Sequence, residues 1–279
     1  MRVVERIDEV RSFVRAVGRS TVGLVATLGA LHAGHRSLVE HARAAGDTVV
    51  GSLFLNPTQF SEEADLESYP RTREGDLALF RNAGASLVFA PTVQTMYPPG
   101  FDTAVLPGRA GERLEGAGRP GHFRGVCTVV AKLLNIVTPA RAYLGQKDAQ
   151  QVAVLRRMVA DLDMDVELVV CPTVRDPDGV ALSSRNALLT PEQRARAVAI
   201  PRALEACRGR FRSGERDAGA LRATLRDRLR GRVDLEYVSV ADPDTMAELD
   251  DVERPAVASV AARVGDVRLI DNVVLEPVS

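Results

Sequence analysis

The chain has 279 residues, 46% of them hydrophobic, and a formal net charge of −1. This length can bury one large core or two smaller ones, while the near-zero charge gives no global electrostatic case for binding nucleic acid or anionic lipid. The three cysteines lack a CxxC pair, which disfavours a zinc site or a disulfide framework. Neither a signal peptide nor a membrane-length apolar stretch is found, so we expect a cytoplasmic protein.

Apolar runs alternate with helical patterns over the first two thirds of the chain. The apolar runs predict strands at Gly23–Thr27, Thr48–Leu55, Leu87–Ala90, Arg141–Leu144 and Val166–Cys171. Helices are predicted at His35–Ala45, Arg73–Ala83, Val126–Val137 and Gln150–Leu162. This alternation is typical of a mainly parallel sheet covered by helices on both faces. In such sheets, ligands bind beyond the carboxyl ends of the strands, near the point where the strand order reverses.

Two histidines follow the first of these strands, in the order strand, glycine-bearing turn, His32-Ala33-Gly34-His35, helix. This order predicts both imidazoles at a helix N-terminus, where free backbone N–H groups and the helix dipole favour anions. Histidines there can donate hydrogen bonds to phosphate and respond to charge on a leaving group. A lone histidine would be better interpreted as a cap or core residue, but this pair in this context indicates nucleotide chemistry.

Two further polar motifs follow predicted strands: Asn56-Pro57-Thr58-Gln59 and Gly145-Gln146-Lys147-Asp148. Motifs at several strand ends are what a site fed by several loops would produce. Only two of the 36 basic residues are lysines; Lys147 lies in a loop-like segment, whereas Lys132 is interpreted as an ordinary helix residue. The chain has no GxxxxGK[ST] motif and no GxGxxG after the first strand, which disfavours a P-loop ATPase and a dinucleotide site.

The composition changes after about residue 190. Thr190 is predicted to cap a helix with Pro191 at its first position. Two arginine-rich helical stretches follow at 192–212 and 215–231, and then short strands at Leu235–Val240, Ala256–Ala262 and Val267–Ile270. This pattern predicts a second, smaller α+β domain. Its arginines are interpreted as solvated helix faces, because no aromatic residues are interleaved with them as in nucleic-acid sites.

The segment Leu182-Ser183-Ser184-Arg185-Asn186 follows a turn at 176–179. Two hydroxyls and a guanidinium on one mobile loop suit the β- and γ-phosphates of a nucleotide. Alone, this segment is better interpreted as a surface loop with a helix cap. Together with the histidine pair, it supports nucleotide binding.

HAGH together with LSSRN resembles the HIGH and KMSKS motifs of the nucleotidyltransferase superfamily that includes class I aminoacyl-tRNA synthetases. More closely, the chain resembles the pantoate–β-alanine ligase family. The matching segments are TLGALHAGHRSLVEHAR, FLNPTQF, YPRT, LEGAGRPGHFRGVCTVVAKLLNIV, GQKDAQQ, CPTVRDPDG, LSSRNALLTPEQR and RLIDN. The resemblance implies a Rossmann-like N-terminal domain with the ATP and acid sites (1–173), a smaller α+β lid domain (174–279) and a homodimer.

The family makes an amide in two steps. A carboxylate attacks the α-phosphate of ATP to give an acyl-adenylate and pyrophosphate, and an amine then displaces AMP. The resemblance implies that Mg²⁺ bridges the phosphates, with Asp76 as an outer ligand or, equally, as a surface helix acid. It also implies catalytic roles for His35 (the proton donor), His32, Lys147, Ser183, Ser184 and Arg185. The implied ATP contacts are Leu28, Gly29, His32, Gly34, His35, Gly145, Gln146, Lys147, Asp148, Val174, Leu182, Ser183, Ser184 and Arg185.

The acid and amine end is implied to involve Gln59 and Gln151, which would bind the hydroxyl and carboxylate of the acid, together with Asn56, Tyr69, Arg119 and His122.

The sequence departs from the family pattern at Ala26, Leu28 and Leu144, positions that form the wall of the pantoate pocket in the family. Changes of this size shift selectivity by about 1–3 kcal/mol, so a ligase for another acid or amine is the alternative. A nucleotide-binding protein without turnover is disfavoured by the complete set of phosphate motifs. A tRNA synthetase is also disfavoured, because roughly ninety residues after LSSRN leave no room for an anticodon-binding region.

Overall fold

The computed structural model describes residues 1–61 and 63–277, and the chain divides into two compact units. The N-terminal unit comprises residues 1–145 and 154–171, and the C-terminal unit comprises 146–153 and 172–279. The division therefore falls inside one helix, and residues 146–153 group with the second unit. Within the described ranges, no helix has the length and apolar character needed to cross a membrane.

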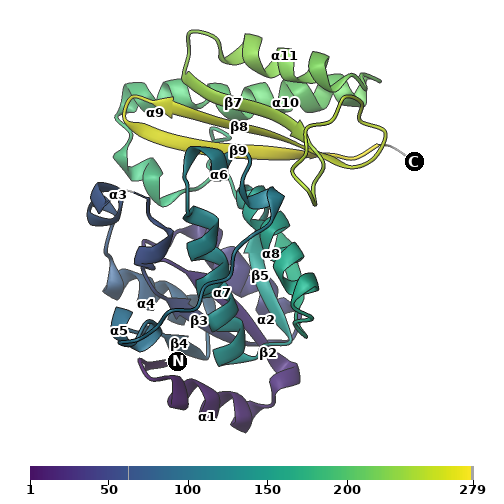
Figure 1. Cartoon of the computed structure of the whole chain (residues 1–279). Helices are drawn as coiled ribbons and strands as arrows, with labels where there is room; N and C mark the ends of the chain where they lie inside the picture. Colours follow the sequence, from purple (N-terminus) through teal and green to yellow (C-terminus); the bar gives the residue numbers. More distant parts are fainter. Residues whose placement is uncertain (62, 278–279) are drawn as a thin grey trace. The chain divides into compact units, whose positions relative to one another are not determined.

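The N-terminal unit contains a six-stranded, fully parallel sheet in the order β1-β4-β3-β2-β5-β6 (Figure 1). The parallel sheet predicted from the apolar runs is thereby confirmed. Strands β3, β4 and β1 lie on one side of β2, and strands β5 and β6 lie on the other. The strand order therefore reverses between β2 and β5. The strands are β1 (Arg2–Val4), β2 (Val22–Thr27), β3 (Thr48–Leu53), β4 (Leu87–Phe89), β5 (Arg141–Gly145) and β6 (Glu167–Cys171).

Helices cover both faces of this sheet because its buried side chains alternate between two cores. Leu24 and Val50 belong to one core, whereas Val25 and Val49 belong to the other. The first core takes side chains from α1 (Ile7–Val17), α7 (His122–Val137) and the part of α8 (Ala149–Asp161) that lies in this unit. The second takes them from α2 (Ala33–Ala44) and α4 (Arg73–Ala83). Shorter segments are α3 (Glu63–Ser68), α5 (Val93–Met96), α6 (Glu115–Gly118) and the 3₁₀ turns η1 (Arg19–Thr21), η2 (Pro57–Gln59) and η3 (Arg109–Gly111).

The C-terminal unit is the predicted α+β fold, a three-stranded antiparallel sheet packed against helices (Figure 1). Small residues Ala256, Ala258 and Ala262 alternate along β8 and share one hydrophobic core with the helices. The predicted helical stretch 192–212 forms two helices, and Thr190 caps the first of them as predicted. The elements are η4 (Gln146–Asp148), η5 (Ser184–Leu188), α9 (Pro191–Ala197), α10 (Ala199–Arg212), α11 (Ala218–Leu229), β7 (Asp234–Ala241), β8 (Ala256–Val264) and β9 (Val267–Leu275).

Candidate active site

The turn from β2 to α2 carries the histidine motif. Gly29 and Ala30 both have positive φ angles, 107° and 51°, which reverse the chain sharply after the strand. Glycine adopts this conformation freely, whereas alanine there is strained by about 1–2 kcal/mol. A second element must therefore hold the turn.

Asp76, in the first turn of α4, holds it. Its carboxylate accepts hydrogen bonds from the backbone N–H groups of Ala30 (3.1 Å) and Leu31 (2.8 Å) and from the hydroxyl of Thr72 (3.0 Å). Asp76 is only 2% exposed, so the interpretation as a surface helix acid is wrong. Buried carboxylates need such donors, because an unpaired one is costly to desolvate.

The two histidines cap α2 reciprocally. His32 is the N-cap residue, and its Nδ1 accepts from Gly34 N at 3.1 Å. His35, at the third helical position, accepts from His32 N through its own Nδ1 at 3.3 Å, and the ring centroids lie 4.2 Å apart. Since each Nδ1 is an acceptor, the neutral rings carry their protons on Nε2, which is then the donor nitrogen. The structure thus places both predicted histidines at the helix N-terminus, but it commits the Gly34 N–H to His32.

A buried amide network follows β3. Asn56 is 0% exposed; its Nδ2 donates to Gln59 Oε1 (3.1 Å) and Gly125 O (3.2 Å). Its Oδ1 accepts from the hydroxyls of Thr58 (3.0 Å) and Tyr97 (2.8 Å). Burial raises the pKa of Tyr97 and keeps its hydroxyl protonated as a donor. The Nδ2 and Oδ1 atoms of Asn56 are thus both hydrogen-bonded to protein groups, and the Nδ2 atom fixes the position of Gln59 Oε1.

His122 and Arg119 lie beside this network. His122 Nδ1 is 2.8 Å from the carbonyl oxygen of Gln59, and Arg119 lies near both His122 Nε2 (3.5 Å) and Asp65 Oδ2 (3.7 Å). Tyr69 packs edge-on against Phe60, with the ring centroids 5.8 Å apart. Of the six residues predicted at the acid and amine end, the N-terminal unit therefore brings Asn56, Gln59, Arg119 and His122 together.

Lys132, on α7, contacts two aromatic rings. The sequence predicted only an ordinary helix residue at this position. Its Nζ lies 4.6 Å from the ring centroid of Phe101 and 5.9 Å from that of Tyr97. Burial lowers the pKa of this ammonium group. Lys132 therefore stabilises the 97–101 segment, one of whose rings carries the hydroxyl that donates to Asn56.

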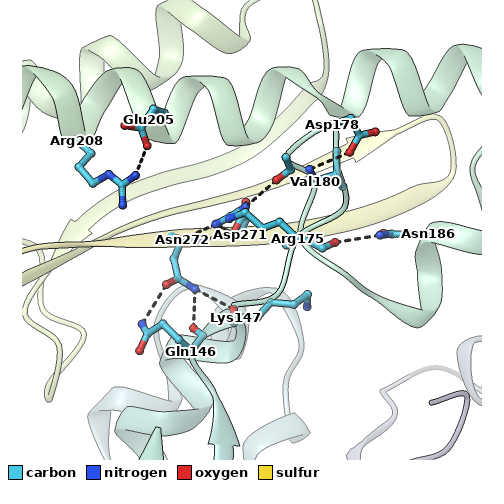
Figure 2. A network of polar contacts seen from close by, with 12 residues as sticks. Gln146, Lys147, Arg175, Asp178, Val180, Asn186, Glu205, Arg208, Asp271 and Asn272 are labelled. Atoms are coloured by element: carbon cyan, nitrogen blue, oxygen red, sulfur yellow. Dashed lines mark hydrogen bonds and ion pairs between the residues drawn. The ribbon is translucent and has the colours of Figure 1, made fainter. Parts of the chain in front are cut away.

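Lys147 lies in the 3₁₀ turn η4, directly after β5 in the chain, and its Nζ is 3.4 Å from Asp148 Oδ1. Figure 2 shows Asn272 of β9 bonded to this turn. The Nδ2 of Asn272 donates to the carbonyl oxygens of Gln146 and Lys147, both at 2.9 Å, and its Oδ1 accepts from Gln146 Nε2 at 3.0 Å. Gln151 follows in the first turn of α8 and belongs to the same unit.

The segment 182–186 leads into the capped 3₁₀ turn η5. Ser183 accepts from Arg185 N and caps η5, and Asn186 Nδ2 donates to Ala181 O at 2.9 Å. Leu182 N bonds to Val174 O, which joins this segment to the residue predicted near adenine. The two serines and Arg185 are therefore presented together from one compact turn.

The predicted site residues are divided between the two units. Gly125, Asp271 and Asn272 were not predicted, although Asn272 lies in the RLIDN segment that carries the family resemblance. The N-terminal unit holds Leu28, Gly29, His32, Gly34, His35, Asn56, Gln59, Tyr69, Asp76, Arg119, His122 and Gly145, and the C-terminal unit holds Gln146, Lys147, Asp148, Gln151, Val174, Leu182, Ser183, Ser184 and Arg185.

The whole chain matches known proteins. The family model for pantoate-beta-alanine ligase covers residues 2–274. A pantothenate synthetase of Roseiflexus castenholzii is 54% identical over 99% of this chain and 100% of its own length, and one of Thermotoga neapolitana is 49% identical over the same shares. The crystal structure of pantothenate synthetase from Thermus thermophilus superposes with a TM-score of 0.94 at 45% identity, covering 99% of this chain and 100% of that one. The crystal structure of a Francisella tularensis pantoate-beta-alanine ligase, complexed with beta-gamma ATP and beta-alanine, superposes with a TM-score of 0.81 at 33% identity. That match covers 100% of this chain and 99% of the other.

Proposed function

The chain belongs to the pantoate–β-alanine ligase family, and we propose that it joins pantoate to β-alanine with ATP by the residue roles set out below. In the first step a pantoate carboxylate oxygen attacks the α-phosphorus, and the bond to pyrophosphate breaks. In the second step the β-alanine nitrogen attacks the acyl carbon, loses a proton, and AMP leaves. The match over the whole chain, with relatives near 50% identity, carries this conclusion.

The first step needs donors where charge develops on the departing pyrophosphate. His32 and His35 offer Nε2–H donors at the N-terminus of α2, because their Nδ1 atoms accept backbone N–H groups. We assign His35 as the proton donor. Lys147 would contact the α-phosphate region, and Ser183, Ser184 and Arg185 the distal phosphates. The support for these roles is the motif positions and the capped geometry of each segment.

Mg²⁺ is proposed to enter with ATP. Within the described ranges, no group of three or more His, Cys, Asp or Glu side chains could hold a metal ion. Asp76, the predicted outer ligand, already takes three donors and is almost fully buried. The buried, hydrogen-bonded carboxylate of Asp76 fits an ion whose direct ligands would be phosphate oxygens and water, as is usual for Mg²⁺ with nucleotides. Asp76 would then act on the ion only through water.

The acid is proposed to bind through the amides of Gln59 and Gln151, with Tyr69, Arg119 and His122 completing the acid and amine end. Asn56 has no exposed surface, so we assign it the task of orienting Gln59. Ala26 and Leu144, where the sequence departs from the family pattern, pack against the core of the N-terminal unit. No finding favours another acid, and the relatives near 50% identity are pantothenate synthetases.

The two half-reactions test this assignment. With ATP and pantoate alone, the enzyme should release about one pyrophosphate per site; adding β-alanine should release AMP and start turnover. A wild-type enzyme that releases no pyrophosphate with pantoate contradicts the function. His35→Ala should lower the adenylation rate by about 10²-fold, the usual effect of losing one donor to developing charge.

His41→Ala is the matched control for that variant. His41 lies exposed on the same helix, with its Nδ1 2.7 Å from the carbonyl oxygen of Ser37. Its removal should leave adenylation unchanged. Equal rates for His35→Ala and wild type would refute the role of His35 while leaving the function itself standing.

We also propose a homodimer formed through the N-terminal unit. Its support is the family resemblance and three exposed apolar side chains between β4 and α6, namely Val93 (51% exposed), Phe101 (36%) and Leu106 (73%). Interfaces are commonly marked by exposed apolar side chains that form a contiguous patch, so Leu106, which has the largest exposed fraction of the three, is the residue to test. Sedimentation equilibrium should give twice the chain mass, and Leu106→Glu should lower it. A monomer at micromolar concentration would contradict the proposal.

A further inference from the structure

The dipeptide Asp271-Asn272 on β9 holds two segments that lie far from it in the sequence. Both side chains are buried, each 4% exposed. Asn272 bonds to the turn that contains Lys147, and Asp271 bonds to Arg175, which lies before the segment 182–186 (Figure 2). All of these residues belong to the C-terminal unit. Buried polar side chains are retained only with partners, so each contact is a specific feature of the fold.

Asn272 uses its whole amide on the Lys147 turn. Its two N–H groups go to successive carbonyl oxygens, those of Gln146 and Lys147, and its oxygen accepts from the Gln146 side chain. The contact fixes main-chain atoms on both sides of the Cα of Lys147. Because these bonds are to the backbone, they set where the lysine side chain starts without touching its ammonium group.

Asp271 fixes the start of the second segment. Its carboxylate takes a two-pronged hydrogen bond from Arg175, at 2.6 and 2.9 Å, and accepts from Asn272 N at 2.8 Å. Arg175 also donates to Gly179 O, and its backbone pairs with Ala181. Ser183, Ser184 and Arg185 follow immediately. One point on β9 therefore holds both the Lys147 turn and the base of the serine-arginine segment.

We propose that Asn272 is a positioning residue for adenylation, which acts by fixing the backbone of Lys147. The proposal rests on the function proposed above, in which Lys147 contacts the α-phosphate region. It extends that function to the RLIDN segment, to which the sequence alone assigns no role. A displacement of a reacting group by about 1 Å can cost about 10²-fold in rate, so loss of this backbone contact has a kinetic effect.

Asn272→Asp is the sharpest test, because it keeps the size and the acceptor oxygen. It replaces the two N–H donors with an oxygen that faces two carbonyl oxygens. The rate of pantoate-dependent pyrophosphate release should fall by about 10- to 10²-fold, while the KM for β-alanine stays at the wild-type value. Asn135→Asp is the matched control: Asn135 also donates to one backbone carbonyl, that of Ala131 on α7, and should leave the rate unchanged.

A double-mutant cycle separates positioning from a general structural effect. In a Lys147→Ala background, Asn272→Asp should change the remaining rate by less than about twofold, because the residue through which it acts is gone. A full additional loss in that background would overturn the proposal, as would a wild-type rate in the Asn272→Asp single variant. A fully active Lys147→Ala would refute the role of Lys147 and the positioning role together, whereas an impaired Lys147→Ala beside an active Asn272→Asp would refute positioning alone.

Amine labelling gives a readout other than activity. The chain has two lysines, so the extent of acetylation at Lys147 can be measured by mass spectrometry against Lys132 in the same molecule. Asn272→Asp should change this ratio and weaken the protection of Lys147 by ATP; an unchanged ratio and unchanged protection count against the proposal. If Asn272→Asp does not fold, as judged by circular dichroism, Asn272→Ser retains one short donor and is put through the same cycle with the same criteria.

Discussion

Gly125 shows how a residue without a side chain shapes the site. It lies on α7 against the segment that follows Asn56, and a Cβ there would lie 2.3 Å from Thr58 O and 2.6 Å from Gln59 Cα. Both neighbours are backbone atoms, so they cannot move aside by a change of rotamer. The close approach also lets Asn56 donate to Gly125 O. The absence of a side chain at 125 thus sets where the Gln59 amide lies.

Gly125→Ala should displace the 57–59 turn from α7. We expect a loss of about 1–3 kcal/mol in the free energy of unfolding, as is usual for overpacking. The KM for pantoate should rise more than the KM for ATP, because Gln59 serves the acid in the proposed function. Urea unfolding and steady-state kinetics with each substrate varied measure the two effects.

Gly209→Ala is the control for this substitution, since Gly209 lies in α10 with nothing within 4 Å of a new Cβ. Alanine there should stabilise the helix by about 0.5–1 kcal/mol through its higher helix propensity. Equal stability changes for the two variants would show that the crowding at Gly125 is harmless.

At the scale of elements, the hydrophobic pattern predicted the strands whose side chains are buried on both faces of the sheet. The five apolar runs became parallel strands because a strand buried on both faces needs a continuous apolar stretch. β1 was missed because three residues give too short a pattern. Helix α1 was also missed, although its apolar residues recur at helical spacing and pack into the core, so the sequence did carry a signal for it. The stretch 192–212 was taken as one helix, since Pro201 is compatible with the first turn of α10 and leaves no clear break.

The site was predictable where a local motif carries it and not where distant segments meet. The position of His32 and His35 at a helix N-terminus could be predicted from the order of strand, turn and helix. Their reciprocal cap could not, because it depends on side-chain rotamers. The contact between Asn272 and Gln146 joins positions 126 residues apart in the sequence, and no local pattern reports it. The grouping of Lys147 with the C-terminal unit has the same origin.

At the scale of the whole molecule, the two units carry their own buried thiols. Cys127 and Cys171 lie in the N-terminal unit and Cys207 in the C-terminal unit, all at most 1% exposed. Burial raises their pKa values from 9.0 to about 12 for Cys127 and about 11 for Cys171 and Cys207. Since thiolate forms only as the pH approaches the pKa, the native protein at pH 8 holds almost none.

The three cysteines should therefore resist iodoacetamide at pH 8 until the unit that contains them unfolds. In increasing urea, alkylation of Cys207 should report on the C-terminal unit, and that of Cys127 and Cys171 on the N-terminal unit. Peptide mapping by mass spectrometry gives the three midpoints separately. Rapid stoichiometric labelling of any of the three in native buffer would contradict both the burial and the raised pKa values.

The turn below the histidines has a consequence for how easily this protein could lose its activity. Between Ala30 and Gly34, four main-chain amides are already engaged, two by Asp76 and two by the imidazoles. A glycine-rich phosphate loop recognises its anion through main-chain N–H groups, which among the amino acids only proline lacks. In the function proposed above, the imidazole side chains and not these four amides contact the phosphates, so a single substitution at His32 or His35 should lower activity while the fold survives. Inactive but well-folded descendants should therefore arise readily from such a scaffold.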